Sequence, residues 1–343
     1  MTELTLVLPF ALPPPELAPD LVRALRTPSL AALITRTSSH HSDPFDNAAR
    51  ALPHELWLAR ALGLGQSPHQ QSALRLAAAV MRGHGLDPGE GHWLIVHPAH
   101  VEISRSHLLM HDLRRLGLAD AESRALFDSA KPYFDESGHT LLYADAQTWF
   151  LRADAWRGLD TASPDAATGM NLTDWLPLGT AASAYRKLQN EVQMLWHGHP
   201  ANAAREARGL AAINGFWPWA GAEAADRSSP GIALATRAAP SWLTRLATHP
   251  DTSLSALDAV NAPLLVDGSL AESALAADWA GWLTQMQRLE DELFAPLLAA
   301  LATGRRKRLR LVLSRREAQL DITTSPMAQR AFWRRPSLDR LSP

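Results

Sequence analysis

The segment between residues 197 and 223 gathers side chains that could bind an anion. Asn202 is typical of the residue that caps the start of a helix, and Gly209 is typical of the residue that follows a helix end. The sequence "NAAREAR" between them therefore predicts a short helix. Unpaired backbone N–H groups and the helix dipole attract negative charge to such a helix start.

The chain after Gly209 can fold back, which would bring the extended segment Asn214–Trp219 beside the start of this helix. We expect any pocket to lie there, with Arg205 as the counter-charge and His199 at the rim. In the alternative interpretation, Asn202 only caps the helix and Arg205 faces solvent. The ligand-binding residues predicted from this segment are His199, Asn202, Arg205, Asn214 and Trp217.

A second polar cluster, "SSHHSDPFD", spans residues 38–46 and contains His40, His41, Asp43 and Asp46. Its serines could supply a nucleophile, and its imidazoles and carboxylates could ligate a metal. Clusters of Ser, His, Asp and Pro are more typical of polar loops, so we expect a loop here.

The charge of the chain is unevenly distributed. The 33 Lys and Arg residues and 35 Asp and Glu residues give a net charge of −2, whereas residues 305–343 carry 11 cations against 3 anions, a net of +8. The basic segment "RRKRLR" could contact the phosphates of a nucleic acid. Charged residues also protect edge strands against pairing with other chains, and this second role is the one we expect.

The composition excludes several classes of protein. The chain has no cysteine, which rules out disulfides, thiolate catalysis and cysteine-ligated zinc. The first residues, "MTELTLVLPF", lack the basic start of a signal peptide, and no apolar run is long enough for a membrane span. We therefore expect a cytoplasmic protein with no membrane partner.

Apolar periodicity predicts an α/β fold, with a mixed or mostly parallel sheet and helices on both faces. Residues 4–10 form a short apolar run typical of a buried strand, and residues 306–324 predict two neighbouring strands joined by a turn. Alternating strand and helix patterns between residues 90 and 157 predict an inserted α+β subdomain. The core domain would then comprise residues 1–89 and 158–343. One helical stripe is predicted to face the core: Trp279, Trp282, Met286, Leu289 and Leu293.

The segment "HPANAAREARGLAAINGFWPWAG" resembles a motif of the archaeal-type cofactor-independent phosphoglycerate mutases, and resembles more closely the RpfE-type regulatory proteins. "RTPSLAALITR" is similar to a helix start of the alkaline phosphatase superfamily, and the chain from "LLVDG" to "RLRLVLS" is similar to its last strand–helix–strand unit. The resemblance implies an alkaline-phosphatase-like fold. It also implies phosphoryl transfer by two divalent metals that Asp and His ligate.

The chain departs from this family pattern at the positions that should ligate metal. The first strand continues as Leu8-Pro9-Phe10 without an Asp, and Asp267-Gly268 is not followed by a His. The Asp-His pair expected after the next strand is replaced by "RREA", and an expected arginine by Trp219-Ala220. We therefore expect no metal, no cofactor and no catalytic residue.

The function predicted from these observations is that of a non-catalytic or regulatory relative of phosphoglycerate mutase. Its partner would be a small anion, such as a phosphorylated metabolite, or a protein. Two alternatives stay open: an active mutase or phosphatase with divergent ligands, and a protein that associates with nucleic acid through its basic C-terminal segment. Nucleic acid is the less expected partner because the whole chain has no positive net charge.

Overall fold

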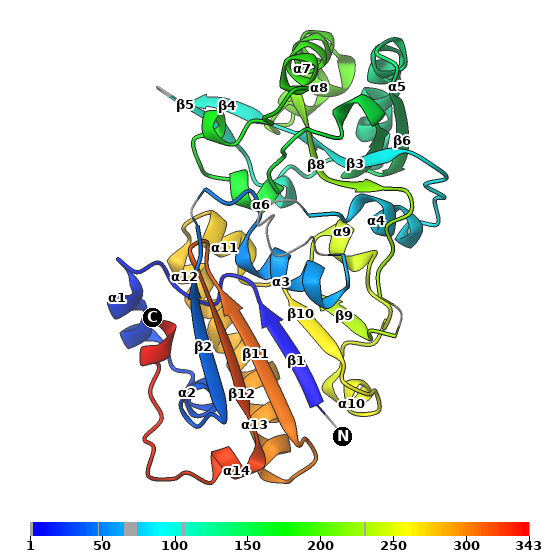
Figure 1. The fold of residues 1–343 in the computed structure, drawn as a ribbon. Helices are drawn as coiled ribbons and strands as arrows, with labels where there is room; N and C mark the ends of the chain where they lie inside the picture. Colours follow the sequence, from blue (N-terminus) through cyan, green and yellow to red (C-terminus); the bar gives the residue numbers. More distant parts are fainter. Residues whose placement is uncertain (1–2, 47, 65–73, 105–106, 230, 343) are drawn as a thin grey trace. The chain divides into compact units, whose positions relative to one another are not determined.

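The computed structural model describes residues 3–46, 48–64, 74–104, 107–229 and 231–342. The chain divides into two compact units (Figure 1). The first unit comprises Met1–Ala48 and Pro230–Pro343, and the second comprises Ala49–Ser229. No helix in these ranges is both long enough and apolar enough to cross a bilayer.

The first unit contains a six-stranded mixed sheet in the order β2-β12-β11-β1-β10-β9. Strands β9, β10, β1 and β11 are parallel, while β12 pairs antiparallel with both β11 and β2. The strands are β1 (Glu3–Leu8), β2 (Ser39–Pro44), β9 (Leu234–Arg237), β10 (Leu264–Asp267), β11 (Arg308–Ser314) and β12 (Ala318–Thr324). The predicted first strand and the pair of strands predicted within residues 306–324 are confirmed.

Helices flank this sheet, and the longest run is continuous from residue 279 to residue 302. In the predicted stripe, Trp282, Met286, Leu289 and Leu293 are buried, and the indole N–H of Trp282 donates to the carbonyl of Phe10 (2.8 Å). The helical elements of this unit are α1 (Ala18–Ala24), α2 (Pro28–Thr35), α9 (Ser241–Thr244), α10 (Leu254–Asp258), α11 (Ala271–Leu275), α12 (Trp279–Leu289), the π-helical turn η4 (Glu290–Phe294), α13 (Ala295–Ala302), α14 (Pro326–Gln329) and the 3-10 turn η5 (Asp339–Leu341).

The second unit contains an antiparallel four-stranded sheet in the order β6-β7-β3-β8 and a separate hairpin, β4–β5. Strand β3 is buried along its whole length, as its apolar sequence "HWLIVHPA" predicts. The strands are β3 (His92–Ala99), β4 (Val101–Ser104), β5 (His107–Met110), β6 (Thr140–Asp145), β7 (Thr148–Arg152) and β8 (Gly215–Glu223).

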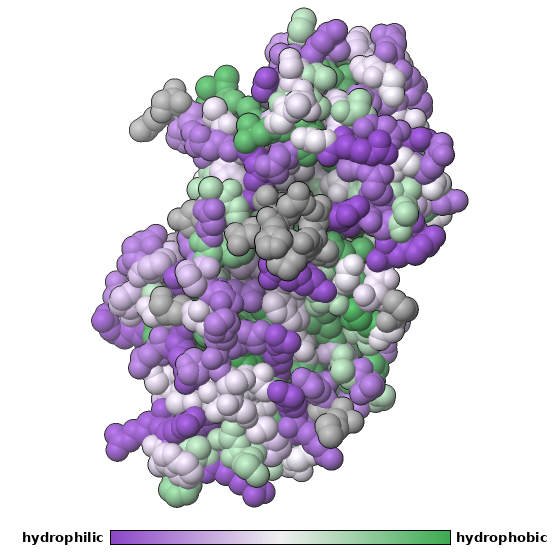
Figure 2. All heavy atoms as spheres, in the orientation of Figure 1, coloured by the Kyte–Doolittle hydropathy of each residue, from purple (hydrophilic) through white to green (hydrophobic). Residues whose placement is uncertain are grey.

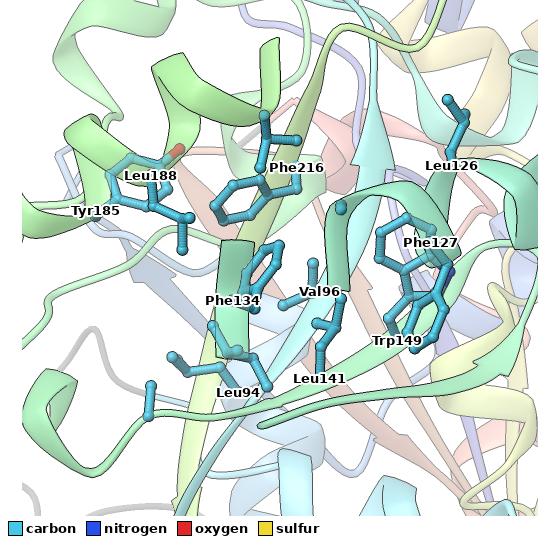
Figure 3. Packing of buried hydrophobic residues seen from close by; sticks show 14 of the residues in the cluster. Leu94, Val96, Leu126, Phe127, Phe134, Leu141, Trp149, Tyr185, Leu188 and Phe216 are labelled. Atoms are coloured by element: carbon cyan, nitrogen blue, oxygen red, sulfur yellow. The ribbon is translucent and has the colours of Figure 1, made fainter. Parts of the chain in front are cut away.

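Two long helices of the second unit, α5 and α7, pack against each other and against strands of this sheet. Their apolar faces meet the sheet in a core rich in aromatic rings, where Phe134 and Tyr185 both pack against Phe216 (Figure 3). The helical elements are α3 (Pro53–Ala61), α4 (Ala77–Gly83), η1 (Leu113–Arg115), α5 (Asp120–Glu136), η2 (Asp154–Trp156), α6 (Pro164–Ala167), η3 (Leu172–Asp174), α7 (Ala182–His197) and α8 (Pro200–Glu206).

The second unit extends beyond the segment 90–157 that local patterns predict. Its central strand β3 pairs with β8 from Ala99 opposite Gly215 to His92 opposite Glu223. The segment contains strands β3 to β7 and helix α5, and β8 and α7 complete its sheet and core from later in the chain. The observed boundaries differ because long-range strand pairing leaves no local signal in the sequence.

Candidate functional site

The carboxyl ends of the parallel strands in the first unit meet at one edge of the sheet, where α/β proteins usually place their ligands. This edge is also where the resemblance implies a two-metal site. Strand β1 continues into Pro9 and Phe10, which are buried and carry no side-chain metal donor. Strand β10 ends at Asp267, which is 1% exposed.

The carboxylate of Asp267 is engaged within the protein. It lies 3.3 Å from the guanidinium of Arg237 and accepts a hydrogen bond from the backbone N–H of Ser269 (3.0 Å). Arg237 also pairs with Glu292. Within the ranges that the structure describes, no three His, Asp or Glu side chains are grouped so that they could hold a metal. The residues at this edge do not fit a pair of divalent metal ions.

The start of helix α2, which resembles a helix start of the superfamily, is occupied by a carboxylate of the same chain. Glu290, which is 4% exposed, accepts hydrogen bonds from the backbone N–H groups of Ser29 (2.7 Å) and Leu30 (3.1 Å). Thr27 is the residue before the helix, but its side chain makes no capping hydrogen bond. Glu290 thus takes the place that an external anion would need.

Replacing Glu290 by alanine should lower the free energy of unfolding by about 1–2 kcal/mol, because two backbone donors at the helix start lose their acceptor. The exposed neighbour Asp291 is the matched control, and Asp291→Ala should change stability by less than about 0.5 kcal/mol. Urea unfolding of both variants would measure the difference. Equal effects for the two variants would contradict the assigned capping role.

The polar cluster at residues 38–46 is a strand for most of its length, so the predicted loop is wrong here. Strand β2 pairs with β12 at the edge of the sheet, with His40 opposite Ile322 and Asp43 opposite Gln319. His41 and Asp43 form an exposed pair at 2.7 Å, and Asp46 accepts from the N–H of Ala48. Backbone pairing with an apolar neighbour strand overrides the polar composition of this segment.

The structure places the first three predicted ligand residues in structural roles. His199, not Asn202, precedes helix α8, and its ring accepts from the N–H of Ala201 (3.1 Å). The buried amide of Asn202 donates to the carbonyls of Trp196 (2.8 Å) and Ile213 (2.7 Å) and accepts from the N–H of Ile213. It therefore joins the end of α7 to the segment before β8, and the prediction of a capping Asn202 is wrong.

Arg205 is fully buried, so neither sequence interpretation describes it. Its guanidinium pairs with Glu122 (2.8 Å) and donates to the backbone carbonyls of Ala211 (2.9 Å) and Leu116 (2.6 Å). Burial by itself would raise the pKa of Glu122, but hydrogen bonds from the N–H of Ala119 and from the arginines outweigh it and lower that pKa. The charge of Arg205 is therefore neutralised within the protein by Glu122.

Asn214 and Trp217 line a cavity of about 330 Å³ within the second unit. The amide of Asn214 exchanges two hydrogen bonds with the backbone of Val101, each 2.8 Å long, and so ties the start of β8 to β4. The indole N–H of Trp217 donates to the carbonyl of Ala162 (2.8 Å), which fixes its ring. Two of the five predicted residues therefore meet at one cavity.

Helix α7 supplies the polar side of this cavity with Arg186, Gln189, Asn190 and Gln193. Their spacing of three, four and seven residues puts them on one helical face, next to the face that carries Tyr185 and enters the core. This spacing is present in the sequence "YRKLQNEVQ", but a polar helical face more often contacts only solvent. The opposite wall is apolar: Ala99, Val101, Ile103, Leu108, Leu172, Leu176 and Phe216.

One close approach shapes the cavity. A side chain at Gly215 would collide with the amide of Gln189, and the carbonyl oxygen of that amide accepts from the N–H of Phe216 (3.2 Å). Among the described residues that line the cavity, Arg186 is the only charged one, and none of them carries a carboxylate. The cavity can therefore accept an apolar group beside a neutral or negatively charged one.

Comparison with known proteins gives a likeness of fold. No family model matches the sequence, and no curated protein matches it. The solved structure of PH0037 protein from Pyrococcus horikoshii is 11% identical over 94% of this chain and 87% of that one, with a TM-score of 0.51. A cofactor-independent phosphoglycerate mutase from Thermoplasma acidophilum is 12% identical over 94% of this chain and 89% of that one, with a TM-score of 0.43. The chain shares the fold of the first of these structures.

Proposed function

We propose that the protein is a non-catalytic relative of the cofactor-independent phosphoglycerate mutases, of the RpfE-type regulatory kind, and that it binds a small anionic ligand in the cavity of the second unit. The cavity beside α7 is the observation that carries the proposal. The buried pairing of Asp267 with Arg237 supports the non-catalytic part, because it uses the carboxylate at the end of β10.

The lining of the cavity favours a molecule with one acidic group. The amides of Asn190 and Gln193 can donate hydrogen bonds to a carboxylate or phosphate, and Arg186 can neutralise its charge. Trp217 and the apolar wall would cover the carbon part of such a molecule. A small metabolite that carries one phosphate group on an apolar carbon part fits this description better than a protein partner, which a cavity of about 330 Å³ does not require.

The non-catalytic part can be tested by elemental analysis after dialysis, combined with a phosphoglycerate mutase assay in added manganese. We expect less than one manganese or zinc per chain and no mutase turnover, because Asp267 is paired with Arg237 and the β1 end offers Pro9 and Phe10. Two tightly held metals together with turnover would support the alternative, an active mutase or phosphatase with divergent ligands.

The binding part can be tested by thermal shift with phosphate and 3-phosphoglycerate. A ligand at about one hundred times its Kd adds about 2.7 kcal/mol, which raises Tm by several degrees. Arg186→Ala should abolish the shift, because it removes the cation that lines the cavity.

Lys187→Ala is the matched control for Arg186→Ala. Lys187 is the next cation on the same helix, with its side chain 80% exposed, and it is not among the lining residues. The Tm of the Lys187→Ala variant should rise with ligand by as much as the Tm of the parent. If neither anion stabilises the parent, or if both variants lose the shift equally, the cavity does not bind such a ligand.

A further inference from the structure

The hairpin of β11 and β12 brings two basic segments of the chain to one end of the first unit. Leu309, at the start of β11, pairs with Thr324, at the end of β12. The residues before β11 and those after β12 therefore lie at the same end of the sheet, where Figure 1 shows α14. The exposed cations of these two segments are Arg305, Lys307 and Arg308 before or at the strand start, and Arg330, Arg334 and Arg335 after α14, whereas Arg306 is buried and pairs with Asp258.

Large apolar side chains project from the same end of this unit. Phe332 is 81% exposed, Trp333 is 70% exposed and Met327 is 81% exposed. The two aromatic rings lie 5.3 Å apart in an edge-to-face arrangement. In Figure 2, strongly hydrophilic and apolar residues lie side by side at the lower end of the view, where Figure 1 places α14. A partner that binds here could contact both the exposed aromatic rings and the cations.

The segment that follows the aromatic pair is fixed to the fold. The side chain of Arg36 donates to the carbonyl of Arg334 (3.2 Å). Thr35 and Ser337 exchange two hydrogen bonds of 2.9 and 3.0 Å. Leu341 further along is fully buried. The backbone next to the rings is thus anchored before any partner binds, which lowers the entropy lost on binding.

We propose that this end of the first unit binds single-stranded nucleic acid. The cations of the two segments would neutralise backbone phosphates, and unpaired bases would stack on Phe332 and Trp333. Arginine supplies five of the six cations, and its planar guanidinium binds phosphate through two donors and stacks on bases, whereas lysine acts as a point charge. The site is separate from the cavity beside α7 and independent of its ligand.

The test is the affinity of the full chain for a fluorescent oligothymidylate of about 15 nucleotides, at low salt and over a salt series. The parent should bind, and it should bind a duplex of the same length at least about tenfold more weakly, because paired bases cannot stack on the rings. Trp333→Leu, which keeps an apolar side chain but removes the indole ring, should weaken binding by at least about tenfold.

The cations are tested by the double variant Lys307→Ala, Arg335→Ala. The slope of log Kd against log salt concentration should fall by about 0.7 for each lost phosphate contact. The matched control is Arg245→Ala. Arg245 is exposed in the same unit, but it follows β9 and α9, at the opposite end of the parallel strands. This control should leave both affinity and slope unchanged.

Met327→Ala separates stacking from general apolar attraction. Met327 is as exposed as Phe332 but has no ring, so its loss should leave oligonucleotide binding within about twofold of the parent. An anionic lipid surface would reward all three apolar side chains. Binding to phosphatidylglycerol vesicles that Met327→Ala and Trp333→Leu weaken alike, without binding of the oligonucleotide, would overturn the proposal. So would oligonucleotide binding that Trp333→Leu does not change.

Discussion

Replacing Arg205 by alanine is expected to lower the free energy of unfolding by about 3–5 kcal/mol, because the change breaks a buried ion pair from one side. The side chain is fully buried and contacts three different segments through Glu122, Leu116 and Ala211. The variant would leave a largely covered carboxylate and two carbonyl groups without their donor. Each such loss costs about 1–3 kcal/mol before the structure relaxes.

Arg208→Ala is the matched control for this prediction. Arg208 also pairs with Glu122, but its side chain is 53% exposed, and exposed ion pairs contribute only about 0–1 kcal/mol. Urea unfolding of the two variants, followed by circular dichroism, would compare them in one experiment. A similarly small decrease in the free energy of unfolding for both variants would mean that Arg205 does not hold these segments together. A ligand-binding role for Arg205 would then have to be considered again.

The burial of Arg205 could not be predicted from the local sequence around it. The composition of residues 197–223 predicts a shared pocket, but Asn202 and Arg205 bind partners inside the fold, and of the five predicted residues Asn214 and Trp217 line the cavity. Whether Arg205 meets a ligand or an internal partner depends on Glu122, which lies more than eighty residues earlier in the chain. A pattern within one segment cannot reveal a partner at that distance.

The fold could be predicted wherever one element carries its own periodicity. The stripe of α12, the strand pair at residues 308–324 and the apolar strand β3 follow from local spacing. Strand β2 could not be predicted in this way, because its polar side chains are exposed and only backbone pairing with β12 makes it a strand. Pairing of β3 with β8 set the boundaries of the second unit for the same reason.

Only part of the cavity lining could be predicted from local sequence. Asn214 and Trp217 were predicted from the segment that contains them, whereas Arg186 and the amides of α7 were not. The spacing of those amides is visible in the sequence, but a polar helical face usually contacts only solvent. The polar face of α7 lines the cavity because α7 lies beside β8 in the fold.

The second large effect concerns Glu55, a buried carboxyl group in the first turn of α3. It is 2% exposed and accepts a hydrogen bond from the backbone N–H of Leu52 (2.7 Å). Burial, and next the nearby charge of Asp165, raise the pKa of Glu55 to about 8. In the unfolded chain a glutamate has a pKa of about 4.3. The folded protein therefore holds a proton at neutral pH that the unfolded chain releases.

This difference predicts how stability depends on pH. Because the folded pKa is raised, the stabilisation is fully present below about pH 4, and it is lost as pH rises towards about 8. The contribution of Glu55 to the free energy of unfolding should fall by about 1.4 kcal/mol for each pH unit in this window. Buried histidines such as His97, whose pKa is lowered chiefly by burial, act in the opposite direction. The contribution of Glu55 must therefore be isolated by a variant.

The variant Glu55→Gln isolates the contribution of Glu55 to the free energy of unfolding, because glutamine keeps the shape and the acceptor oxygen but stays neutral at every pH. The free energy of unfolding of the parent minus that of the variant, measured in urea from pH 5.5 to 8.5, should fall steadily up to about pH 8 and then level off. Glu206→Gln, at an exposed position on α8, should give a difference that is independent of pH over this range. A flat profile for Glu55→Gln would mean that the carboxyl group is already ionised at neutral pH. Its burial beside Asp165 would then have to be compensated by partners other than Leu52, since an unpaired buried charge costs several kcal/mol.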